Sequence, residues 1–254
     1  MPRKSPEHNE PIMPDEERHQ AALEWQRQAE EYEGSASKYG MFRTDGESNW
    51  PFETDKTINE LHGMSFLEYI ERRLGERSNS GKFKVLDVGG GAGLFADQLK
   101  EKFGDDISVF TTGLKKSVAQ EQREQSGKSS LPKEYLKWRS IRELQNFPEF
   151  DLITDTFGEF YYEAGGTPDP RKSEKPKNAE ERLRKYLYAI VAKLDDEGMA
   201  SCSPLPPWLK AEPELAENIL EELKSEFPEW NIHTDVFVNE GFSALRILKE
   251  RKAA

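Results

Sequence analysis

Three glycines at alternate positions form a turn suited to holding a small polar or anionic ligand. Gly89, Gly91 and Gly93 follow Asp87, which stands near the end of a short apolar run. Glycine adopts positive φ at no steric cost and lets a ligand approach the backbone closely. Amides at the start of a helix that follows such a turn favour a negative or polar group. The spacing therefore predicts a nucleotide-type cofactor site, and we call residues 89–93 the glycine turn.

Predicted strands and helices alternate along the part of the chain that would position this turn. Short apolar runs predict strands over 83–88, 107–112, 135–138, 150–155 and 199–202, and helical spacing predicts helices over 93–103, 115–126, 180–194 and 213–226. Such alternation favours a mainly parallel sheet with helices on both faces. Two last runs, 232–238 and 242–248, share a short glycine-containing link, which is typical of an antiparallel hairpin. We therefore expect an α/β, three-layer sandwich whose seven-stranded, mostly parallel sheet ends in that hairpin.

The N-terminal region differs in character from the alternating part. Residues 1–20 are polar and rich in proline, which predicts a disordered tail. Residues 21–56 form a helical and aromatic extension that either closes over the site as a lid or docks on the sheet. Residues 57–74 carry apolar side chains at three- and four-residue spacing, which predicts an amphipathic helix at the start of the main domain, 57–254.

Two later segments are expected to be loops. Residues 163–179 are rich in Gly, Pro and Lys, which predicts a mobile connection. The basic stretch within it, Arg171–Lys177, is expected to be solvated. The run Ser203–Trp208 contains a Pro-Pro-Trp sequence, and we interpret it as a rigid loop after the fifth strand.

The composition narrows the classes of function. The chain has 254 residues and a formal net charge of -12, which argues against general nucleic-acid binding. Its single cysteine, Cys202, excludes an internal disulfide and favours a reducing compartment, so we expect a cytoplasmic protein. No apolar run approaches the ~20 residues that a bilayer crossing needs. The four histidines are scattered without ligand spacing, so we expect no metal site.

The motif Asp87-x-Gly89-x-Gly91-x-Gly93, the alternating units and the closing hairpin resemble the class I (Rossmann-like) S-adenosylmethionine-dependent methyltransferases. The resemblance covers about residues 60–250. In that family the first-strand acid and the glycines border the methionine part of the cofactor. A carboxylate can accept hydrogen bonds from the cofactor's ammonium group. The resemblance therefore implies S-adenosyl-L-methionine as cofactor and methyl transfer to a small-molecule or protein acceptor.

The sequence departs from the family pattern at two strand ends. The family usually has an acid at the tip of the second strand, where it accepts both ribose hydroxyls. Here Thr111 and Thr112 stand at that tip, and we expect Thr112 to make a weaker, single hydrogen bond. The family often has an aspartate after the third strand that contacts the adenine amine. Here we expect Ser140 to substitute for it and Ile141 to pack on the purine.

The end of the fourth strand carries two acids. Asp155 and Glu159 stand where the family places residues that assist the transfer, beside the glycine turn. The resemblance implies that they orient a nucleophile or accept its proton, with Asp155 also bordering the cofactor. The alternative interpretation is a strand-end cap or a solvated acid.

Two other functions compete with an active methyltransferase. A nicotinamide-dependent oxidoreductase would need Gly-x-Gly-x-x-Gly, but Leu94 stands where the third glycine belongs. Lys115 and Lys116 would be the residues to meet a 2′-phosphate. A catalytically inactive, methyltransferase-like binding or regulatory protein is the second alternative, and the departures at the second and third strand ends motivate it.

Overall fold

The structure is a computed structural model that describes most of the chain from residue 57 onward. The described residues are 57–77, 81–90, 94–113, 135–137, 141–144, 147–156, 158–166, 174–239 and 242–252. The predicted tail, the N-terminal extension and the predicted helix over 115–126 lie outside them.

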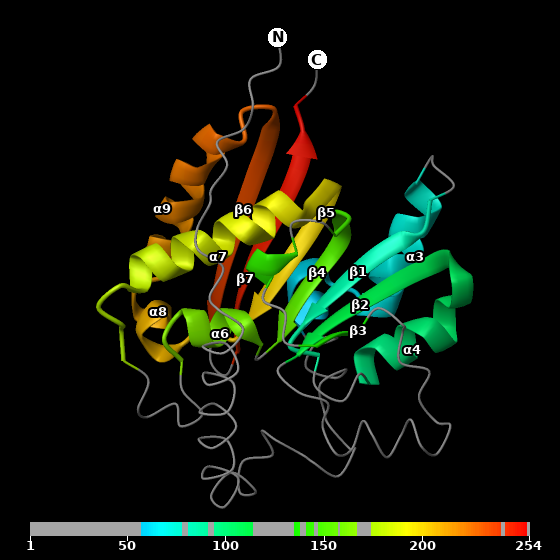
Figure 1. The fold of residues 1–254 in the computed structure, drawn as a ribbon, viewed down its shortest axis with the longest axis horizontal. Helices are drawn as coiled ribbons and strands as arrows, with labels where there is room; N and C mark the ends of the chain where they lie inside the picture. The colour runs from blue at the N-terminus through cyan, green and yellow to red at the C-terminus, as the bar shows by residue number, and fades with distance from the viewer. Residues whose placement is uncertain are drawn as a thin grey trace, which may run out of the picture.

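A single mixed sheet of seven strands forms the centre of the molecule, in the order β3-β2-β1-β4-β5-β7-β6 (Figure 1). Strands β1 to β5 pair in parallel, and β7 runs antiparallel to both β5 and β6. Both the predicted alternation and the antiparallel hairpin are thus confirmed. The strands are β1 (Phe83–Val88), β2 (Ile107–Gly113), β3 (Tyr135–Lys137), β4 (Phe150–Thr156), β5 (Leu194–Ser203), β6 (Trp230–Asn239) and β7 (Phe242–Arg251).

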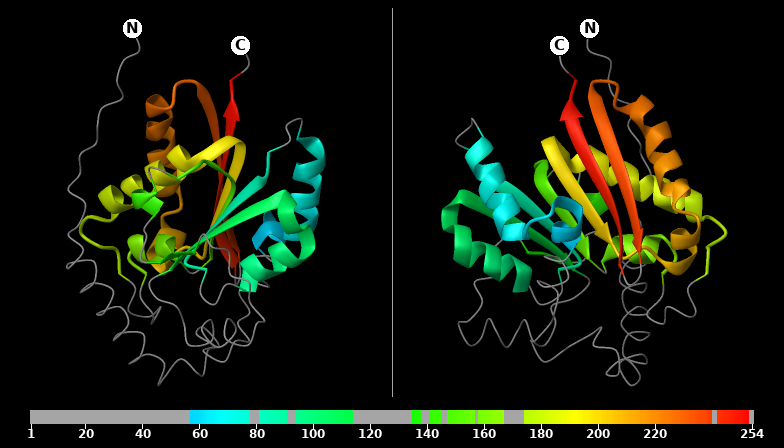
Figure 2. Two further views of the ribbon diagram at one scale, coloured as in Figure 1. Left: turned by 45° about the vertical axis from the view of Figure 1, so that its right-hand side comes forward. Right: turned by 180° about the vertical axis from the view of Figure 1, so that it is seen from behind.

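Helices cover both faces of the sheet, as Figures 1 and 2 show. On one face lie α3 (Phe66–Glu76) and α4 (Leu94–Phe103), and on the other lie α6 (Glu159–Glu163), α7 (Ala179–Lys193) and α9 (Glu214–Leu223). Successive strand residues point to opposite faces, so Val85 joins the core under α3 and α4, whereas Leu86 joins the core under α7. Among the described helices none has both the length and the apolarity to cross a membrane.

The strand order reverses between β1 and β4: β2 and β3 lie on one side of β1, whereas β4 and β5 lie on its other side. In parallel α/β sheets this reversal opens a crevice at the carboxyl ends of the strands. The glycine turn follows β1 at this edge, and α6 follows β4 at the same edge. The fold therefore places the two motifs of interest side by side.

The single helix predicted over 57–74 is wrong, because the structure breaks it at Gly63. Residues 57–62 are helical, Gly63 has φ +66°, and α3 begins at Phe66. Ser65 caps α3 through a capping box: its Oγ accepts from the amide of Glu68, whose carboxylate accepts from the amide of Ser65. A glycine that ends one helix, followed by a Ser-x-x-Glu start signal, overrides the continuous apolar spacing.

Two loop predictions also need correction. Within the predicted loop 203–208, a short helix α8 (Pro207–Ala211) begins, and proline suits its first position because that amide has no helical partner. Within the predicted loop 163–179, α6 still includes residue 163 and α7 begins at residue 179. Residues 167–173 lie outside the described part of the chain.

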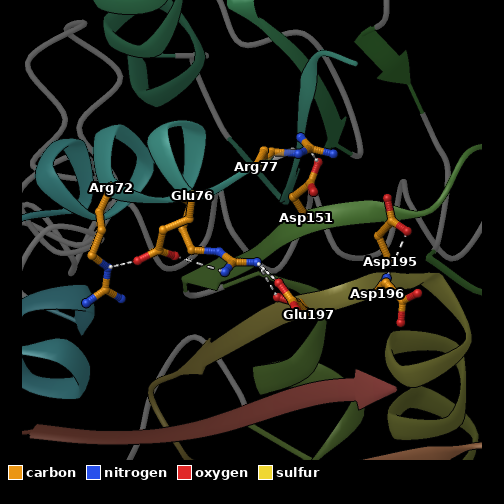
Figure 3. Close-up of polar contacts among 8 residues, drawn as sticks. Arg72, Glu76, Arg77, Asp151, Asp195, Asp196 and Glu197 are labelled. Carbon is orange, nitrogen blue, oxygen red and sulfur yellow. Dashed lines mark hydrogen bonds and ion pairs between the residues drawn. The ribbon is translucent and has the colours of Figure 1, made fainter. Parts of the chain in front are cut away.

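Strand β5 begins five residues before its predicted start, at the acidic run that follows Leu194. Its pairing with β4 shifts register between Phe150 and Leu152, and Glu197 has φ +57°. Polar contacts hold this start: Arg73 Nη2 donates to the Glu197 carbonyl oxygen at 2.9 Å. Arg77 Nη1 donates to Asp151 Oδ2 at 3.1 Å (Figure 3). These contacts lie at the amino ends of β4 and β5, opposite the edge that carries the glycine turn.

Candidate functional site

The predicted cofactor acid, Asp87, is buried at the carboxyl end of β1. Thr154 Oγ1 donates to Asp87 Oδ1 at 3.1 Å. The other oxygen, Oδ2, lies beside the turn, because a Cβ built on Gly90 would be 2.2 Å from it. Burial raises the pKa of Asp87 to about 7, although the Thr154 hydrogen bond lowers it in part. No basic side chain of the described residues contributes to that pKa, so the carboxylate is desolvated without a counter-ion there.

The start of the glycine turn is tied to two neighbouring strand ends. Gly89 has φ +71°, and its amide donates to Thr112 Oγ1 at 3.0 Å. The Gly90 amide donates to the Thr112 carbonyl oxygen at 3.1 Å. A Cβ on Gly89 would lie 2.8 Å from the Cα of Gly158, so the turn also touches the connection after β4. Glycine is therefore required at position 89 both for its φ and for its close approach. Gly91 and Gly93 lie outside the described residues.

The end of β2 differs from what a ribose-binding strand tip would provide. The hydroxyl oxygen of Thr112, the predicted ribose contact, already accepts a hydrogen bond from the Gly89 amide. Its hydroxyl hydrogen can still donate to a ligand. Thr111 pairs in register with Asp87 and shares its face of the sheet. Thr111 Oγ1 is buried, with no hydrogen-bond partner in the part of the chain described. The ribose contact of Thr112 stays a prediction.

The carboxylate of Asp155 is surrounded by donors. Its Oδ1 accepts from the Gly158 amide at 2.9 Å, and its Oδ2 accepts from the Phe160 amide at 2.8 Å and from the Tyr186 hydroxyl. Burial raises the pKa of Asp155 to about 7, against the opposing effect of these three hydrogen bonds. The contacts make Asp155 a cap for the start of α6. These contacts agree with the alternative interpretation of Asp155 as a strand-end cap. A catalytic role for Asp155 stays a prediction.

Glu159 connects two predicted site elements. Its Oε2 accepts from the Ile141 amide at 3.0 Å, at the start of the short 3₁₀ helix η2 (Ile141–Glu143). Arg142 Nη2 lies 3.8 Å from Glu159 Oε1 and 2.7 Å from Glu163 Oε1. Arg182 of α7 also pairs with Glu163. Charged groups thus join η2, α6 and α7, and a catalytic role for Glu159 stays a prediction.

The predicted adenine contacts are only partly described. Ile141 is 1% exposed and belongs to the core beneath α7, so its side chain has almost no free surface for a purine. Ser140 lies outside the described residues. The structure brings Ile141 next to Glu159, but neither approaches Asp87 through a hydrogen bond or ion pair in the described part.

Sequence reasoning missed three residues that shape the site: Thr154, Gly158 and Tyr186. Thr154 stands beside Asp87 because β1 and β4 are paired neighbours. Gly158 precedes α6 and contacts Val88, and only its residue type signals a close approach. Tyr186 follows Leu183 by three residues, so helical spacing marks it as buried but does not tell which acid it meets. In the described residues, no group of three His, Cys, Asp or Glu side chains could hold a metal ion.

No protein-family model and no curated protein matches the sequence. Among solved structures, the chain is similar to magnesium protoporphyrin IX methyltransferase (ChlM) from Synechocystis PCC 6803 with bound SAM, at 13% identity and a TM-score of 0.47, covering 87% of this chain and 94% of that one. It is also similar to an S-adenosylmethionine-dependent methyltransferase from Clostridium acetobutylicum ATCC 824, at 16% identity and a TM-score of 0.44, covering 73% of this chain and 90% of that one. TrmN from Thermus thermophilus matches at 19% identity and a TM-score of 0.45 over 73% of this chain, which spans 48% of TrmN's length. Two of these solved structures are thus named as methyltransferases, one described as S-adenosylmethionine-dependent and the other with bound SAM.

Proposed function

We propose that this chain is an S-adenosyl-L-methionine-dependent methyltransferase. The observation that carries the proposal is the Asp87 carboxylate, which is buried at the switch point of the sheet with one oxygen beside the glycine turn. A buried carboxylate without a nearby cation is costly, and a cationic ligand would offset that cost. S-adenosylmethionine carries two positive groups, an ammonium and a sulfonium, and it therefore suits this position.

The residues present fit the methionine end of such a cofactor. Asp87 Oδ2 would accept from the ammonium group, while Thr154 holds the other oxygen in place. Gly90 presents no side chain toward Asp87, and a Cβ at Gly90 would lie 2.2 Å from Asp87 Oδ2, which is too close for the carboxylate to keep its position. Replacement of Gly90 would therefore displace the proposed cofactor acid.

The chemistry of the proposed reaction requires little of the protein. When bound, S-adenosylmethionine supplies an activated methyl group on sulfur, which an acceptor nucleophile attacks in line. The chain's own contribution is to orient the cofactor, align the acceptor and exclude water. Asp87 supports this by ionic orientation at the ammonium, away from the reacting carbon.

The direct test is calorimetric titration with S-adenosylmethionine and S-adenosylhomocysteine. We expect both to bind, and Asp87→Asn to weaken binding by about 10- to 100-fold because it removes a charge-assisted contact. The matched variant is Asp105→Asn, which changes a fully exposed aspartate at the opposite edge of the sheet and should leave affinity unchanged. No heat of binding to the wild-type chain at millimolar ligand would overturn the proposal.

A binding protein without turnover is the second candidate. The observation that favours it is that both carboxylate oxygens of Asp155 and one of Glu159 already accept hydrogen bonds from backbone amides. Such a protein would bind S-adenosylhomocysteine yet release no methylated product with any acceptor. Turnover of radiolabelled S-adenosylmethionine on any substrate would exclude it.

For the acceptor, we propose a small molecule or a protein side chain rather than a nucleic acid. The formal net charge of -12 supports this choice, because a negative chain as a whole repels a phosphate backbone. We expect no electrophoretic shift of duplex or single-stranded RNA with the cofactor-loaded protein at low ionic strength. A shift that weakens steeply with added salt would contradict it.

A further inference from the structure

A tyrosine in the middle of α7 contacts the end of β4 and the start of α6. Tyr186 is fully buried, and its hydroxyl donates to Asp155 Oδ2. Its ring also contacts the ring of Phe160, with centroids 5.8 Å apart. The Tyr186 side chain therefore connects α7 to α6 and to the end of β4.

Asp155 also contacts the backbone that lies beside the glycine turn. The same carboxylate that accepts from Tyr186 accepts from the Gly158 amide at 2.9 Å. Gly158 in turn is pressed against β1, because a Cβ on Gly158 would be 2.3 Å from the Val88 carbonyl oxygen. The Cα of Gly158 would likewise be 2.8 Å from a Cβ on Gly89. One hydrogen bond and one close backbone approach therefore link the Asp155 carboxylate to Gly89, the first residue of the turn.

Building on the proposed function, we propose that Tyr186 is a positioning residue for the cofactor turn. Its hydroxyl holds the Asp155 carboxylate on the amides of Gly158 and Phe160, and that contact holds Gly158 against Gly89. Tyr186 itself touches neither the turn nor any reacting atom. Its effect on ligand binding passes entirely through Asp155.

The ionisation state of Asp155 decides how firmly the contact holds. An ionised carboxylate accepts on both oxygens, whereas a protonated one must use one oxygen partly as a donor. Burial and the nearby Asp87 of β1 raise the pKa of Asp155, and the Tyr186 hydrogen bond lowers it. The other titratable groups that face this pair are Cys202 of β5 and Glu159 of α6. Glu159 has Arg142 Nη2 3.8 Å from its Oε1, whereas the charge that acts on Asp155 itself is that of Asp87, which raises its pKa. Loss of the Tyr186 hydroxyl therefore favours protonated Asp155 near neutral pH.

The first experiment measures the contact without any ligand. Tyr186→Phe keeps the ring against Phe160 and removes only the hydroxyl. We expect the hydrogen-exchange protection factors of the Gly158 and Phe160 amides to fall by about tenfold near neutral pH and to recover at higher pH, where Asp155 ionises again. Tyr188→Phe, two residues along α7, removes the hydroxyl of a half-buried tyrosine whose ring packs beside Phe227, and it should leave both amides unchanged. Equal protection in the wild type and Tyr186→Phe at every pH would overturn the proposal.

The second experiment connects the contact to the turn, with 5′-methylthioadenosine as the probe. This ligand lacks the amino-acid part, so pairing between its ammonium and Asp87 does not enter. We expect Tyr186→Phe to weaken binding several-fold near neutral pH, with the wild-type affinity regained about one pH unit higher. A loss that is equal at all pH values would show a packing defect and overturn the positioning role.

The two experiments separate the inference from the proposed function. If the wild type binds neither S-adenosylhomocysteine nor 5′-methylthioadenosine, the proposed function fails, and the exchange data alone decide whether Tyr186 holds Asp155. If the wild type binds both and Tyr186→Phe binds with an unchanged pH profile, the positioning role fails while the function stands.

Discussion

Thr154 Oγ1 lies 3.1 Å from Asp87 Oδ1, and this hydrogen bond joins the carboxyl ends of the paired strands β4 and β1. It is the contact that favours the ionised form of a carboxylate whose pKa burial raises to about 7. An ionised Asp87 attracts a cation, and a protonated Asp87 does not. The balance between burial and this single hydroxyl therefore controls the charge of the proposed cofactor site near neutral pH.

The affinity for S-adenosylmethionine should rise with pH. Between about pH 5.5 and about pH 7 we expect an increase of up to about tenfold per pH unit, because Asp87 loses its proton over that range. Asp87→Asn should flatten the profile, and Thr154→Val should move the rise to higher pH because the opposing hydrogen bond is lost. Calorimetric titrations at several pH values test this, and identical profiles for the wild type and Asp87→Asn would contradict it.

The stability of the ligand-free protein should depend on pH in the opposite direction. The pKa values of Asp87 and Asp155 rise from 3.8 when unfolded to about 7 when folded, so the folded state binds more protons between these values. The stabilisation from both groups is full below about pH 4 and is lost as the pH rises to about 7. Each group then lowers the free energy of unfolding by at most about 1.4 kcal/mol per pH unit.

Comparison with Asp87→Asn isolates the titration of Asp87 together with its effect on Asp155, whose pKa Asp87 raises, because the remaining titrations cancel in the difference. Urea unfolding of both proteins should show that the variant gains on the wild type as the pH rises from about 5 to about 7. A difference that stays constant across this range would mean that Asp87 does not titrate there.

Much of the fold is predictable because buried parallel strands are encoded as continuous apolar runs. The run at Phe83–Val88 and the helical spacing over Leu94–Phe103 each depend on local sequence, and the structure has both elements. The break at Gly63 was not predicted, because apolar spacing continues through it. The early start of β5 was not predicted because acidic residues, rather than apolar ones, occupy it. A hydrogen bond from Arg73 of α3 to the Glu197 carbonyl oxygen holds this segment, and the local sequence does not reveal that contact.

The candidate site was predictable in its residue types but not in its contacts. Asp87 and Gly89 follow from motif spacing alone. The partner of Asp155 is Tyr186, 31 positions later, and no spacing rule fixes how α7 is rotated against the sheet. Glu159 likewise accepts a hydrogen bond from the Ile141 amide, which depends on where η2 lies relative to α6. Long-range side-chain contacts of this kind arise from packing, which a single sequence does not specify.

The glycine turn should tolerate no side chain at its first position. Gly89→Ala combines an unfavourable positive φ with a Cβ only 2.8 Å from the Gly158 Cα. Gly104→Ala has positive φ in open space, so it should cost only about 1 kcal/mol of conformational strain. We expect Gly89→Ala to cost clearly more in the free energy of unfolding and to abolish S-adenosylhomocysteine binding, while Gly104→Ala binds normally. Equal costs for the two variants would show that the turn yields to the added methyl group.

The amino edge of the sheet gives a prediction that is independent of function. Arg77 donates to Asp151 at 3.1 Å, and the side chains are 15% and 4% exposed. Among the described residues, Arg77→Ala leaves the buried Asp151 carboxylate with the Lys84 amide at 2.7 Å as its donor, so we expect a loss of about 3 kcal/mol in the free energy of unfolding. Arg72→Ala, which removes an exposed ion pair one turn earlier in α3, should cost about 0.5 kcal/mol or less.

The pH dependence of the Arg77→Ala loss distinguishes charge from packing. Arg77 lowers the pKa of Asp151, and burial raises it. Without Arg77 the carboxyl group takes up a proton at higher pH, and a neutral carboxyl costs less to bury than an ion. The loss measured by urea unfolding should therefore shrink as the pH is lowered. A loss of constant size down to the acid limit of folding would mean that Arg77 acts through its contact with the Phe83 ring, 5.7 Å from the guanidinium, rather than through its charge.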